Sequence, residues 1–307
     1  MDKKPKPLTT QPSMTLREMH ARFATEDDCK TFIRDSRWPD GVRCPRCGNE
    51  KVYVLKQPFK WQCQSKACGK NGYRFSVTTG TVFENTKYPL RVWFEVGYLM
   101  CQSKKGISAL QIHRQIGSGE YRTAWFMCHR FRAAMKNEEF KQLLGQVEID
   151  ETFLGGKQKN RHKNVRAKYH GGGAANTGKV TVIGAIARKG NVVAQMIENT
   201  SAETLSSFVE QTVNEKVTLV ATDEYVGYTD LKYFYPHESV QHRSGQYVRA
   251  EVHTNNIENF WSLLKRGVVG TFHNVSKDYL PLYLNEFTFR HNERGNPDIF
   301  QKLISSC

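Results

Sequence analysis

The sequence predicts a multidomain protein of mixed α+β and α/β class, with an N-terminal metal-binding ribbon, a helical segment and a C-terminal mixed sheet flanked by helices. Three observations support this prediction. Four cysteines form two close pairs between residues 44 and 68, helical spacing dominates from about 88 to 144, and alternating apolar segments follow. We therefore divide the chain into a disordered lead-in at 1–14, helices and ribbon at 15–87, a helical segment at 88–145 and a final domain at 146–307.

The composition favours a polyanionic partner. The 307 residues include 45 Lys and Arg against 30 Asp and Glu, which gives a formal net charge of +15 and a pI near 9.4. Each cation that meets a phosphate releases condensed counterions, so the charge suits nucleic acid, although ribosome or membrane-surface affinity would need the same charge. No apolar run reaches the ~18 residues of a spanning helix, and the N-terminus lacks the apolar core of a signal peptide. We therefore expect a cytoplasmic protein in a reducing compartment, whose eight cysteines are metal ligands or buried thiols.

Two helices are predicted before the ribbon. Residues 15–41 have helical spacing, and the acidic stretch TEDD at 25–28 marks the start of the second helix. The turn WPDG at 38–41 ends that helix, and Cys29 falls on its inner side as a core thiol.

The four clustered cysteines have the spacing of a zinc ribbon. Cys44 and Cys47 form a C-x2-C pair, Cys63 and Cys68 form a wider C-x4-C pair, and fifteen residues separate the pairs. Each pair can supply two thiolates to a tetrahedral ion, and the alternating sequence between them predicts a hairpin. Four thiolates leave no open position for water, so one Zn²⁺ here would be structural and would supply folding energy. The wider second pair leaves buried or incidental cysteines as the alternative.

The helical segment contains a predicted helix-turn-helix. YPLRVWFEVGYLMCQSKKG reads as one amphipathic helix with Pro89 in its first turn, SALQIHRQIG as a short helix, and YRTAWFMCHRFRAAMK as a basic helix after a glycine-containing turn. The basic helix can enter a major groove, and an all-helical linker without groove contact is the alternative. The candidate DNA contacts are Tyr121, Arg122, Thr123, His129 and Arg130. The expected core residues are Trp125, Phe126 and Phe131, with Cys101 and Cys128 as packed thiols.

A basic loop is predicted at 157–179. This stretch contains seven Lys or Arg and no acid, and it is rich in Gly and Asn, so it cannot bury a core. We interpret it as a phosphate clamp, with a solvated linker as the alternative. Its candidate DNA contacts are Lys157, Lys159, Arg161, Lys163, Arg166 and Lys168.

The last domain is predicted to have a ribonuclease-H-like plan. VEID and VTLVATD read as strands, the second buried on both faces, and KVTVIGAIARKGNVVAQMIE reads as a hairpin. SAETLSSFVEQTV is a helix with Thr200 as N-cap and Glu203 completing a capping box. After an aromatic-rich stretch, QYVRAEVH at 246–253 is a further short strand, followed by a helix. The order strand, hairpin, helix, strand, short helix or loop, strand and helix indicates a mixed central sheet flanked by helices.

Three acids are expected to meet in this domain. Asp150 ends the first strand, Asp223 ends VTLVATD, and Glu258 lies in the helix HTNNIENFWSLLKR. Glu258 and Lys265 are two helical turns apart and therefore share a face. Carboxylates from two strands and a helix can hold two Mg²⁺ (or Mn²⁺) ions about 3.5–4 Å apart, which serve the attacking and leaving oxygens of a phosphodiester. We expect a DNA-cutting and DNA-joining centre in which Lys265 contacts a phosphate.

Each of these residues has an alternative. Glu151 follows Asp150 and Glu224 follows Asp223, and strand alternation admits one acid of each pair to a given face. Glu258 could be a surface acid of its helix, and Lys265 could extend over Trp261. The other residues that could contribute are Asn255 and Asn256 as the third ligand and His253 as an ordering or water-binding group.

Taken together, CPRC…CQSKAC, SALQIHRQIGSGEYRTAWFMCHR, VEIDETFLGGK, TDEYVGY and HTNNIENFWSLLKRG resemble bacterial insertion-sequence transposases. The similar group joins an N-terminal zinc ribbon to a compact DDE domain and is related to the Merlin-type eukaryotic elements. The resemblance extends from about residue 20 to RHNERGN, and it implies catalytic roles for Asp150, Asp223, Glu258 and Lys265. The last two acids are 258 − 223 = 35 residues apart, which is common in that group. In the family-like tail, Arg290, Asn292 and Arg294 are candidate phosphate or core contacts.

The resemblance implies an enzyme that binds the terminal inverted repeats of its own element, cleaves DNA strands and joins the 3′-OH ends to target DNA. It also implies a bacterial, nucleoid-associated protein without a membrane partner. Because two ends must be cut in concert, we expect a homo-oligomer on DNA. Two alternatives remain at this point: a nuclease or resolvase of the same fold without strand transfer, and a non-catalytic zinc-ribbon DNA-binding regulator.

Overall fold

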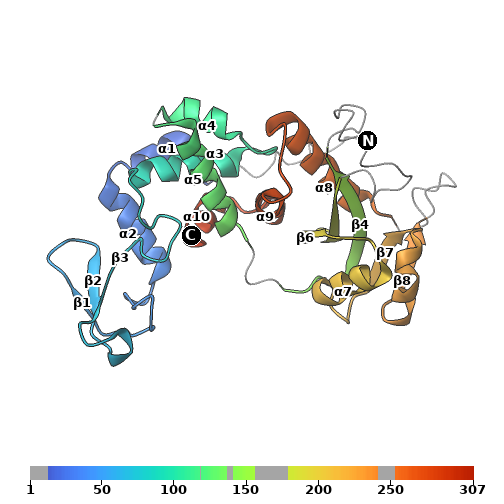
Figure 1. Cartoon of the computed structure of the whole chain (residues 1–307), viewed down its shortest axis with the longest axis horizontal. Coiled ribbons are helices and arrows are strands. Elements are labelled where there is room, and N and C mark those ends of the chain that lie inside the picture. The colour runs from blue at the N-terminus through green and yellow to red at the C-terminus, as the bar shows by residue number, and fades with distance from the viewer. Residues whose placement is uncertain (1–12, 118, 137–140, 156–178, 241–252) are drawn as a thin grey trace, which may run out of the picture. The chain divides into compact units, whose positions relative to one another are not determined.

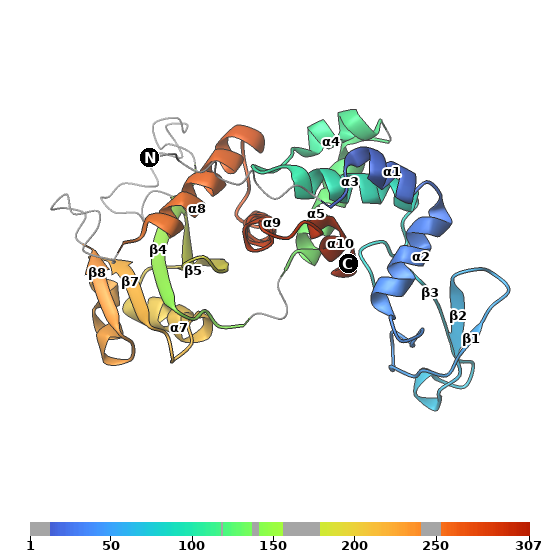
Figure 2. The same cartoon turned by 180° about the vertical axis from the view of Figure 1, so that it is seen from behind.

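The computed structural model describes residues 13–117, 119–136, 141–155, 179–240 and 253–307. The chain forms two compact units (Figures 1 and 2): Met1–Lys136 with Glu293–Cys307, and Asn137–Asn292. The sequence predicted a last domain that runs to residue 307, whereas the final helix of the chain belongs to the first unit. The expected lead-in at 1–14 lies almost wholly outside the described residues.

The N-terminal helices of the first unit begin where the sequence predicted. They are α1 (Leu16–Arg22) and α2 (Glu26–Arg37). Thr25 caps α2 by accepting from the amide of Asp28, whose carboxylate accepts from the Thr25 amide in return. The helix ends at Trp38, and Cys29 is fully buried, so both predictions for this segment are confirmed.

The ribbon is a small antiparallel sheet in the order β1-β2-β3. Its elements are β1 (Val52–Val54), β2 (Lys60–Cys63), the 3-10 turn η1 (Lys66–Cys68) and β3 (Tyr73–Ser76). β1 and β2 form the predicted hairpin, in which Val52 lies opposite Cys63. Trp61 stacks on Phe75 at 5.8 Å between ring centroids, and Trp38 meets both rings edge-on. Apart from these rings the ribbon has little apolar surface to bury.

The helices of the first unit enclose an aromatic core. They are α3 (Leu90–Gln102), α4 (Ala109–Ile116), α5 (Tyr121–Ala134) and α10 (Ile299–Ser305). α4 ends at Gly117 in the left-handed conformation (φ 60°), which a glycine adopts without strain. Phe131 is buried as predicted, and so are the packed thiols Cys101 and Cys128. The prediction for Phe126 was wrong, because 55% of this residue is exposed.

The second unit contains a five-stranded mixed sheet in the order β6-β5-β4-β7-β8. Its strands are β4 (Gln146–Leu154), β5 (Val180–Ala187), β6 (Val192–Ile197), β7 (Leu219–Asp223) and β8 (His237–Val240). β4, β5 and β6 pair antiparallel, whereas β7 pairs parallel to β4 and β8 parallel to β7. The other elements are α7 (Ala202–Thr212), the 3-10 segment η4 (Val226–Tyr233), α8 (Asn255–Arg266), the π-helical turn η6 (Gly267–Thr271) and α9 (Leu280–Asn292).

The two faces of this sheet have separate apolar cores. On one face Val147 and Ile149 of β4 pack with α7 and η4. On the other face Ile257 and Trp261 of α8 pack with strand residues such as Val182 and with α9. Because side chains alternate along a strand, Glu148 and Asp150 are turned toward α8, the face opposite Val147 and Ile149. Figures 1 and 2 show α8 beside β4 and α7 on the far side of the sheet.

Two local predictions in this unit were wrong. Ser201, not Thr200, caps α7 by accepting from the amide of Thr204, since the helix starts one residue later than expected. The fifth strand, β8, lies within the aromatic-rich stretch, where no strand was predicted. The strand expected at 246–253 lies outside the described residues except for its last residue.

Candidate active site

Asp150 lies in the central strand of the sheet. β4 runs between β5 and β7, and Asp150 is opposite Gly184 of β5. The indole Nε1 of Trp261, on α8, donates to Asp150 Oδ2 at 3.1 Å. A side chain at Gly184 would not leave room for this contact, since a Cβ there would lie 2.6 Å from the Trp261 ring. A tryptophan and a glycine therefore bring α8 close to Asp150.

Asp223 is level with Asp150 on the neighbouring strand. The parallel register pairs Gln146 with Leu219 and Glu148 with Ala221. Two residues farther along both strands, the same register aligns Asp150 with Asp223. Adjacent strands are about 4.8 Å apart, so the two acids lie on neighbouring parallel strands at the same level. Asp223 ends β7, whereas Asp150 does not end its strand as the sequence suggested, because β4 continues to Leu154. Asp223 Oδ1 also accepts from the amide of Tyr225 at 3.0 Å.

Glu258 and Lys265 line the same cavity on α8. The cavity measures about 620 Å³ and its lining includes both residues together with Asp150. Both side chains are exposed, whereas the opposite face of α8 is buried. Thr254 Oγ1 donates to Glu258 Oε1 at 3.0 Å at the start of the helix. The other lining residues are Glu151, Thr152, Trp261, Ser262, Arg266, Val269 and Gly270.

The electrostatics of Asp150 reflect this gathering of acids. Burial, and then the charges of Asp223 and Glu258, raise the pKa of Asp150 to about 6. Both other acids are thus near enough to disfavour the Asp150 carboxylate. A divalent cation held among them would remove that cost, and carboxylate oxygens are the hard ligands that Mg²⁺ prefers. The chemistry of these donors suits a divalent metal, although among the described residues the three acids do not come within 4.8 Å of one another as the ribbon cysteines do.

The alternative acid Glu151 and the alternative amides make other contacts. Glu151 also lines the cavity, but it alternates with Asp150 along β4 and the Tyr228 hydroxyl donates to it. Burial raises the pKa of Glu151 to about 7, with further contributions from Asp223 and Asp150. Asn256 donates both its backbone and side-chain N–H groups to Glu148, and Asn255 is exposed at the start of α8.

The four ribbon cysteines converge on one point. Their sulfur atoms all lie within 4.8 Å of one another, and among the described residues no other group of histidine, cysteine or acidic side chains meets that limit. Cys44 and Cys68 are separated by 3.7 Å between sulfurs, Cys47 and Cys63 by 3.7 Å, and Cys47 and Cys68 by 3.4 Å. A tetrahedral Zn²⁺ with Zn–S bonds of about 2.3 Å places its sulfurs about 3.8 Å apart. The predicted ligand set is therefore assembled for zinc.

Comparison with known families finds a domain match for each of the two parts of the chain that carry these residues. A transposase zinc-ribbon domain matches residues 24–71, and an ISXO2-like transposase domain matches residues 142–292. The chain belongs to the ISXO2-like transposases. It is also 29% identical over 287 residues to an uncharacterised protein in the transposable element ISH50 of Halobacterium salinarum, with 90% of this chain and 94% of that protein covered. The transposase is thus a nucleic-acid-processing enzyme with a zinc ribbon, as the sequence resemblance implied. No helix in the described part of the transposase is long and apolar enough to cross a membrane.

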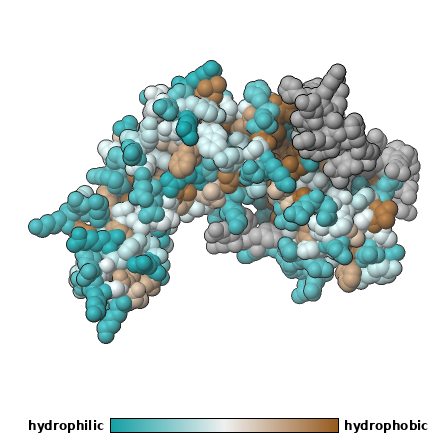
Figure 3. All heavy atoms as spheres, in the orientation of Figure 1, coloured by the Kyte–Doolittle hydropathy of each residue, from teal (hydrophilic) through white to brown (hydrophobic). Residues whose placement is uncertain are grey.

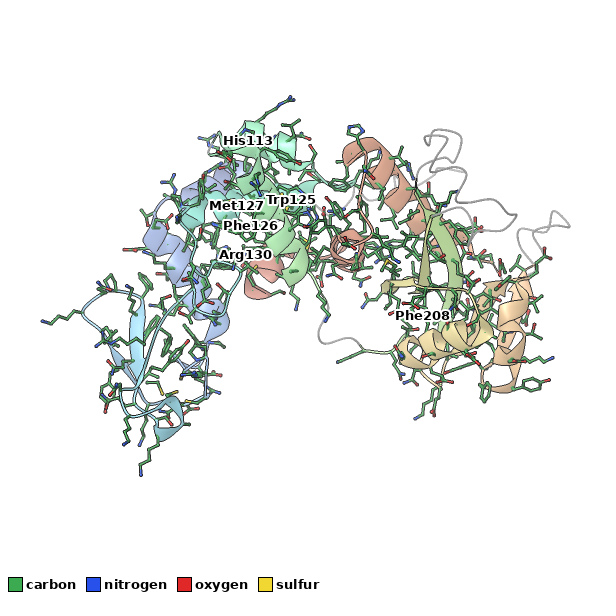
Figure 4. All side chains as sticks on the ribbon, viewed as in Figure 1. His113, Trp125, Phe126, Met127, Arg130 and Phe208 are labelled. Atoms are coloured by element: carbon green, nitrogen blue, oxygen red, sulfur yellow. The ribbon has the colours of Figure 1, made fainter. Side chains whose placement is uncertain are left out.

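The predicted DNA contacts on α5 of the transposase differ in exposure. Tyr121 and Arg122 are exposed at its start, and Thr123 is half-buried. Figure 4 shows Arg130 near Phe126 on this helix, and the Arg130 guanidinium donates to the carbonyls of Glu84 and Thr81. His129 is only 7% exposed and packs on Trp125, so it does not present a surface for DNA. The six candidates of the basic loop, Lys157 to Lys168, lie outside the described residues.

The tail residues of the transposase are mainly core contacts. Arg290 is buried and pairs with Glu286 one turn before it in α9. Asn292 both donates to and accepts from the backbone of Val192 and so holds β6. Arg294 is exposed.

Sequence reasoning missed Glu148 of the transposase. This carboxylate is completely buried in β4 and contacts the first turn of α8. The sequence did contain a signal for a buried acid, because a carboxylate between Val147 and Ile149 in an apolar strand needs a hydrogen-bonding or charged partner. Nothing in the sequence named that partner, since Asn256 is 108 residues away.

Proposed function

We propose that this transposase binds the terminal inverted repeats of its insertion sequence, cleaves DNA strands and joins the 3′-OH ends to target DNA. The observation that carries the proposal is the alignment of Asp150 and Asp223 on adjacent parallel strands, with Glu258 of α8 lining the cavity beside Asp150. The strand order β6-β5-β4-β7-β8, with antiparallel and parallel pairs on either side of β4, supports a ribonuclease-H-like domain.

In this proposal the three carboxylates bind two Mg²⁺ or Mn²⁺ ions. When bound, the ions would activate the attacking oxygen and stabilise the leaving oxygen in an in-line displacement. The charges of both other acids act on Asp150, which is the candidate ligand shared by the two ions. Lys265, seven residues after Glu258 on the same helix face, would hold a phosphate oxygen of the DNA. No covalent protein intermediate is needed.

The zinc ribbon offers a basic surface for the DNA ends. Between residues 43 and 74 every Lys and Arg is exposed, and the single acid, Glu50, pairs with Arg43 at 3.3 Å. Figure 3 shows mainly hydrophilic residues over the visible face of this region. We propose that it contacts phosphates together with Tyr121, Arg122 and Thr123 of a helix-turn-helix formed by α4 and α5. The basic residues are Arg43, Arg46, Lys51, Lys56, Lys60, Lys66, Lys70 and Arg74.

Several parts of the proposal follow from the reaction rather than from the fold. Joining two ends of one element in concert calls for a homo-oligomer on DNA. The basic loop with Lys157, Lys159 and Arg161 would hold flanking or target DNA. A transposase acting on chromosomal DNA would associate with the nucleoid.

A strand-transfer assay tests the function. Pre-cleaved ends, taken from the DNA that flanks the gene, are incubated with the transposase, a supercoiled target and Mg²⁺. We expect joined products with the wild type and a loss of at least 10³-fold in Asp150→Asn, Asp223→Asn and Glu258→Gln, as for groups that act as one catalytic unit. Glu203→Gln, at an exposed acid of α7, is the matched control and should retain activity.

Other results of the same assay would point to other functions. Hydrolysis without joining would identify a nuclease or resolvase of the same fold. End binding that survives all three acid substitutions, with neither cleavage nor joining in the wild type, would identify a DNA-binding regulator.

A further inference from the structure

Glu148 is a buried carboxylate for which the proposed chemistry has no use. It is fully buried in β4, and its oxygens accept three hydrogen bonds from the start of α8. The backbone amides of Asn256 and Ile257 donate to Oε2 at 2.8 and 3.2 Å, and Asn256 Nδ2 donates to Oε1 at 2.7 Å. The strand that carries Asp150 is thus bonded directly to the helix that carries Glu258.

This contact replaces the usual cap of the helix. The first amides of an α-helix have no partner within the helix, and a side chain at the N-cap normally accepts from them. In α8 the N-cap residue Thr254 makes no such bond, and its hydroxyl donates to Glu258 instead. Glu148 accepts from the amides in its place, and a carboxylate is favoured there by the helix dipole. The start of α8 is therefore defined by a residue of the sheet.

The guanidinium of Arg188 compensates the charge of Glu148, and the imidazole of His253 lies beside it. Arg188 Nε donates to Glu148 Oε1 at 3.0 Å, and the same guanidinium donates to the backbone carbonyl of His253 at 3.4 Å. His253 Nδ1 lies 3.1 Å from Glu148 Oε1. A buried carboxylate needs such partners, because removing one group of a buried ion pair leaves an uncompensated charge. The cluster ties β4, the residue after β5 and the chain entering α8 to one another.

We propose that Glu148 is a positioning residue, which sets the placement of Glu258 and Lys265 relative to Asp150. Glu148 is two residues before Asp150 on the same face of β4, and Asn256 is two residues before Glu258 in α8. A shift of the Glu148–Asn256 contact would therefore move Glu258 with respect to Asp150. This inference rests on the proposed function, in which Asp150 and Glu258 share metal ions.

The test compares Glu148→Gln with a matched buried acid. A glutamine keeps the shape but turns one acceptor into a donor, which must then face the Asn256 and Ile257 amides or the Arg188 guanidinium. We expect faster hydrogen exchange at the amides of Asn256 and Ile257. We also expect about tenfold or more weaker Mn²⁺ binding, since substitution of residues that orient metal ligands typically has such an effect. Free Mn²⁺ is measured by electron paramagnetic resonance with the zinc-loaded full-length protein, without DNA.

The control is Glu286→Gln, which breaks the pair with Arg290 in the same unit. Glu286 is as fully buried as Glu148, but it lies in α9. It should lower the melting temperature without changing Mn²⁺ affinity or exchange at Asn256. If Glu148→Gln does not fold, Asn256→Ala takes its place, because it removes one donor to Glu148 and should weaken Mn²⁺ binding in the same direction.

The outcomes separate the two proposals. Unchanged Mn²⁺ affinity in the folded Glu148→Gln protein, or in Asn256→Ala if that variant is used, overturns the positioning role, provided that Asp150→Asn abolishes Mn²⁺ binding. An equal loss of affinity in Glu286→Gln also overturns it. If Asp150→Asn binds Mn²⁺ as the wild type does, the proposed active site itself fails, whatever Glu148→Gln does.

Discussion

At the scale of single residues, the environment of Asp150 combines two opposing requirements. A catalytic acid must be close to other acids to share metal ions, and in Asp150 burial, and then this proximity, raise the pKa. The Trp261 indole donates to one oxygen of Asp150 and favours its charged form. The residue is therefore destabilised as a carboxylate when no cation is present.

This leads to a prediction for the pH dependence of stability. The pKa of Asp150 is about 6 in the folded protein against an ordinary value of 3.8, so folding favours its protonated form. That stabilising contribution is full below about pH 4 and is lost as the pH rises through about 6. In metal-free protein, the free energy of unfolding of the wild type should therefore fall relative to Asp150→Asn between pH 4.5 and 7.

Urea unfolding of both proteins over this range measures the difference, in which titrating groups remote from Asp150 cancel. Saturating Mg²⁺ should reverse the trend for the wild type and leave Asp150→Asn unaffected. Parallel curves for the two proteins would show that Asp150 titrates normally.

Single residues on α5 show where a helical pattern is insufficient. Phe126 was predicted to be a core residue and His129 to contact DNA, yet Phe126 is exposed and His129 is buried. The two are three residues apart on one helix, and hydrophobicity alone does not reveal which of them meets α3 and α4. A buried His129 can support the surface that Tyr121 and Arg122 present without contacting DNA.

At the scale of elements, the ribbon depends on its metal. β1 has three residues and β2 and β3 have four each, so their cross-strand contacts are few. Cys63 is the last residue of β2 and Cys68 is the last residue of η1, so these two zinc ligands lie at the ends of their elements. The coordinate bonds therefore provide the closure that a larger core would give.

We predict that Cys63→Ser releases zinc and unfolds the ribbon. Trp61, which is 6% exposed and stacked on Phe75, should become solvated, with a red shift of its fluorescence. Cys128→Ala, at a buried thiol remote in sequence from the ligands, should keep one zinc per chain. Atomic absorption and tryptophan emission measure both effects. Retention of zinc by Cys63→Ser would exclude it as a ligand.

The contact between β5 and α8 gives a second prediction at this scale. In Gly184→Ala the new methyl would lie 2.6 Å from Trp261 and 3.2 Å from Ile257, so α8 must move outward. Displacing a catalytic group by about 1 Å can cost about 10²-fold in rate, and we expect a loss of that size in strand transfer. Gly295→Ala, where a Cβ meets nothing within 4 Å, is the control. Full activity of Gly184→Ala would show that the Trp261 side chain can shift to make room for the methyl group without moving Glu258.

At the scale of the whole molecule, the chain crosses from the first unit to the second and returns. α9 completes the second unit by packing along β6, and α10 completes the first by packing on α3. Phe300 of α10 meets the rings of Phe23, Phe94 and Tyr98. The last fifteen residues are therefore part of the N-terminal unit, and Phe300, Leu303 and Ile304 belong to its core.

We predict that Phe300→Ala destabilises the first unit by about 3–5 kcal/mol, as expected for a buried phenylalanine. Differential scanning calorimetry should show one transition shifted down and the transition of the second unit retained. Phe234→Ala, at a residue that is 71% exposed, should leave both transitions in place. An equal shift of both transitions in Phe300→Ala would show that the two units unfold as one.

The sequence alone determined the features that depend on local spacing. The cysteine pairs, the start of α2 and the hairpins follow from neighbours a few residues apart, and the structure confirms them. The register also brings Asp150 level with Asp223, although β4 continues beyond Asp150, while their catalytic roles remain a proposal. Only the tertiary structure decided that Glu148 caps α8, that His129 is buried and that α10 joins the first unit. Each of these depends on packing between segments distant in sequence, which local periodicity does not encode.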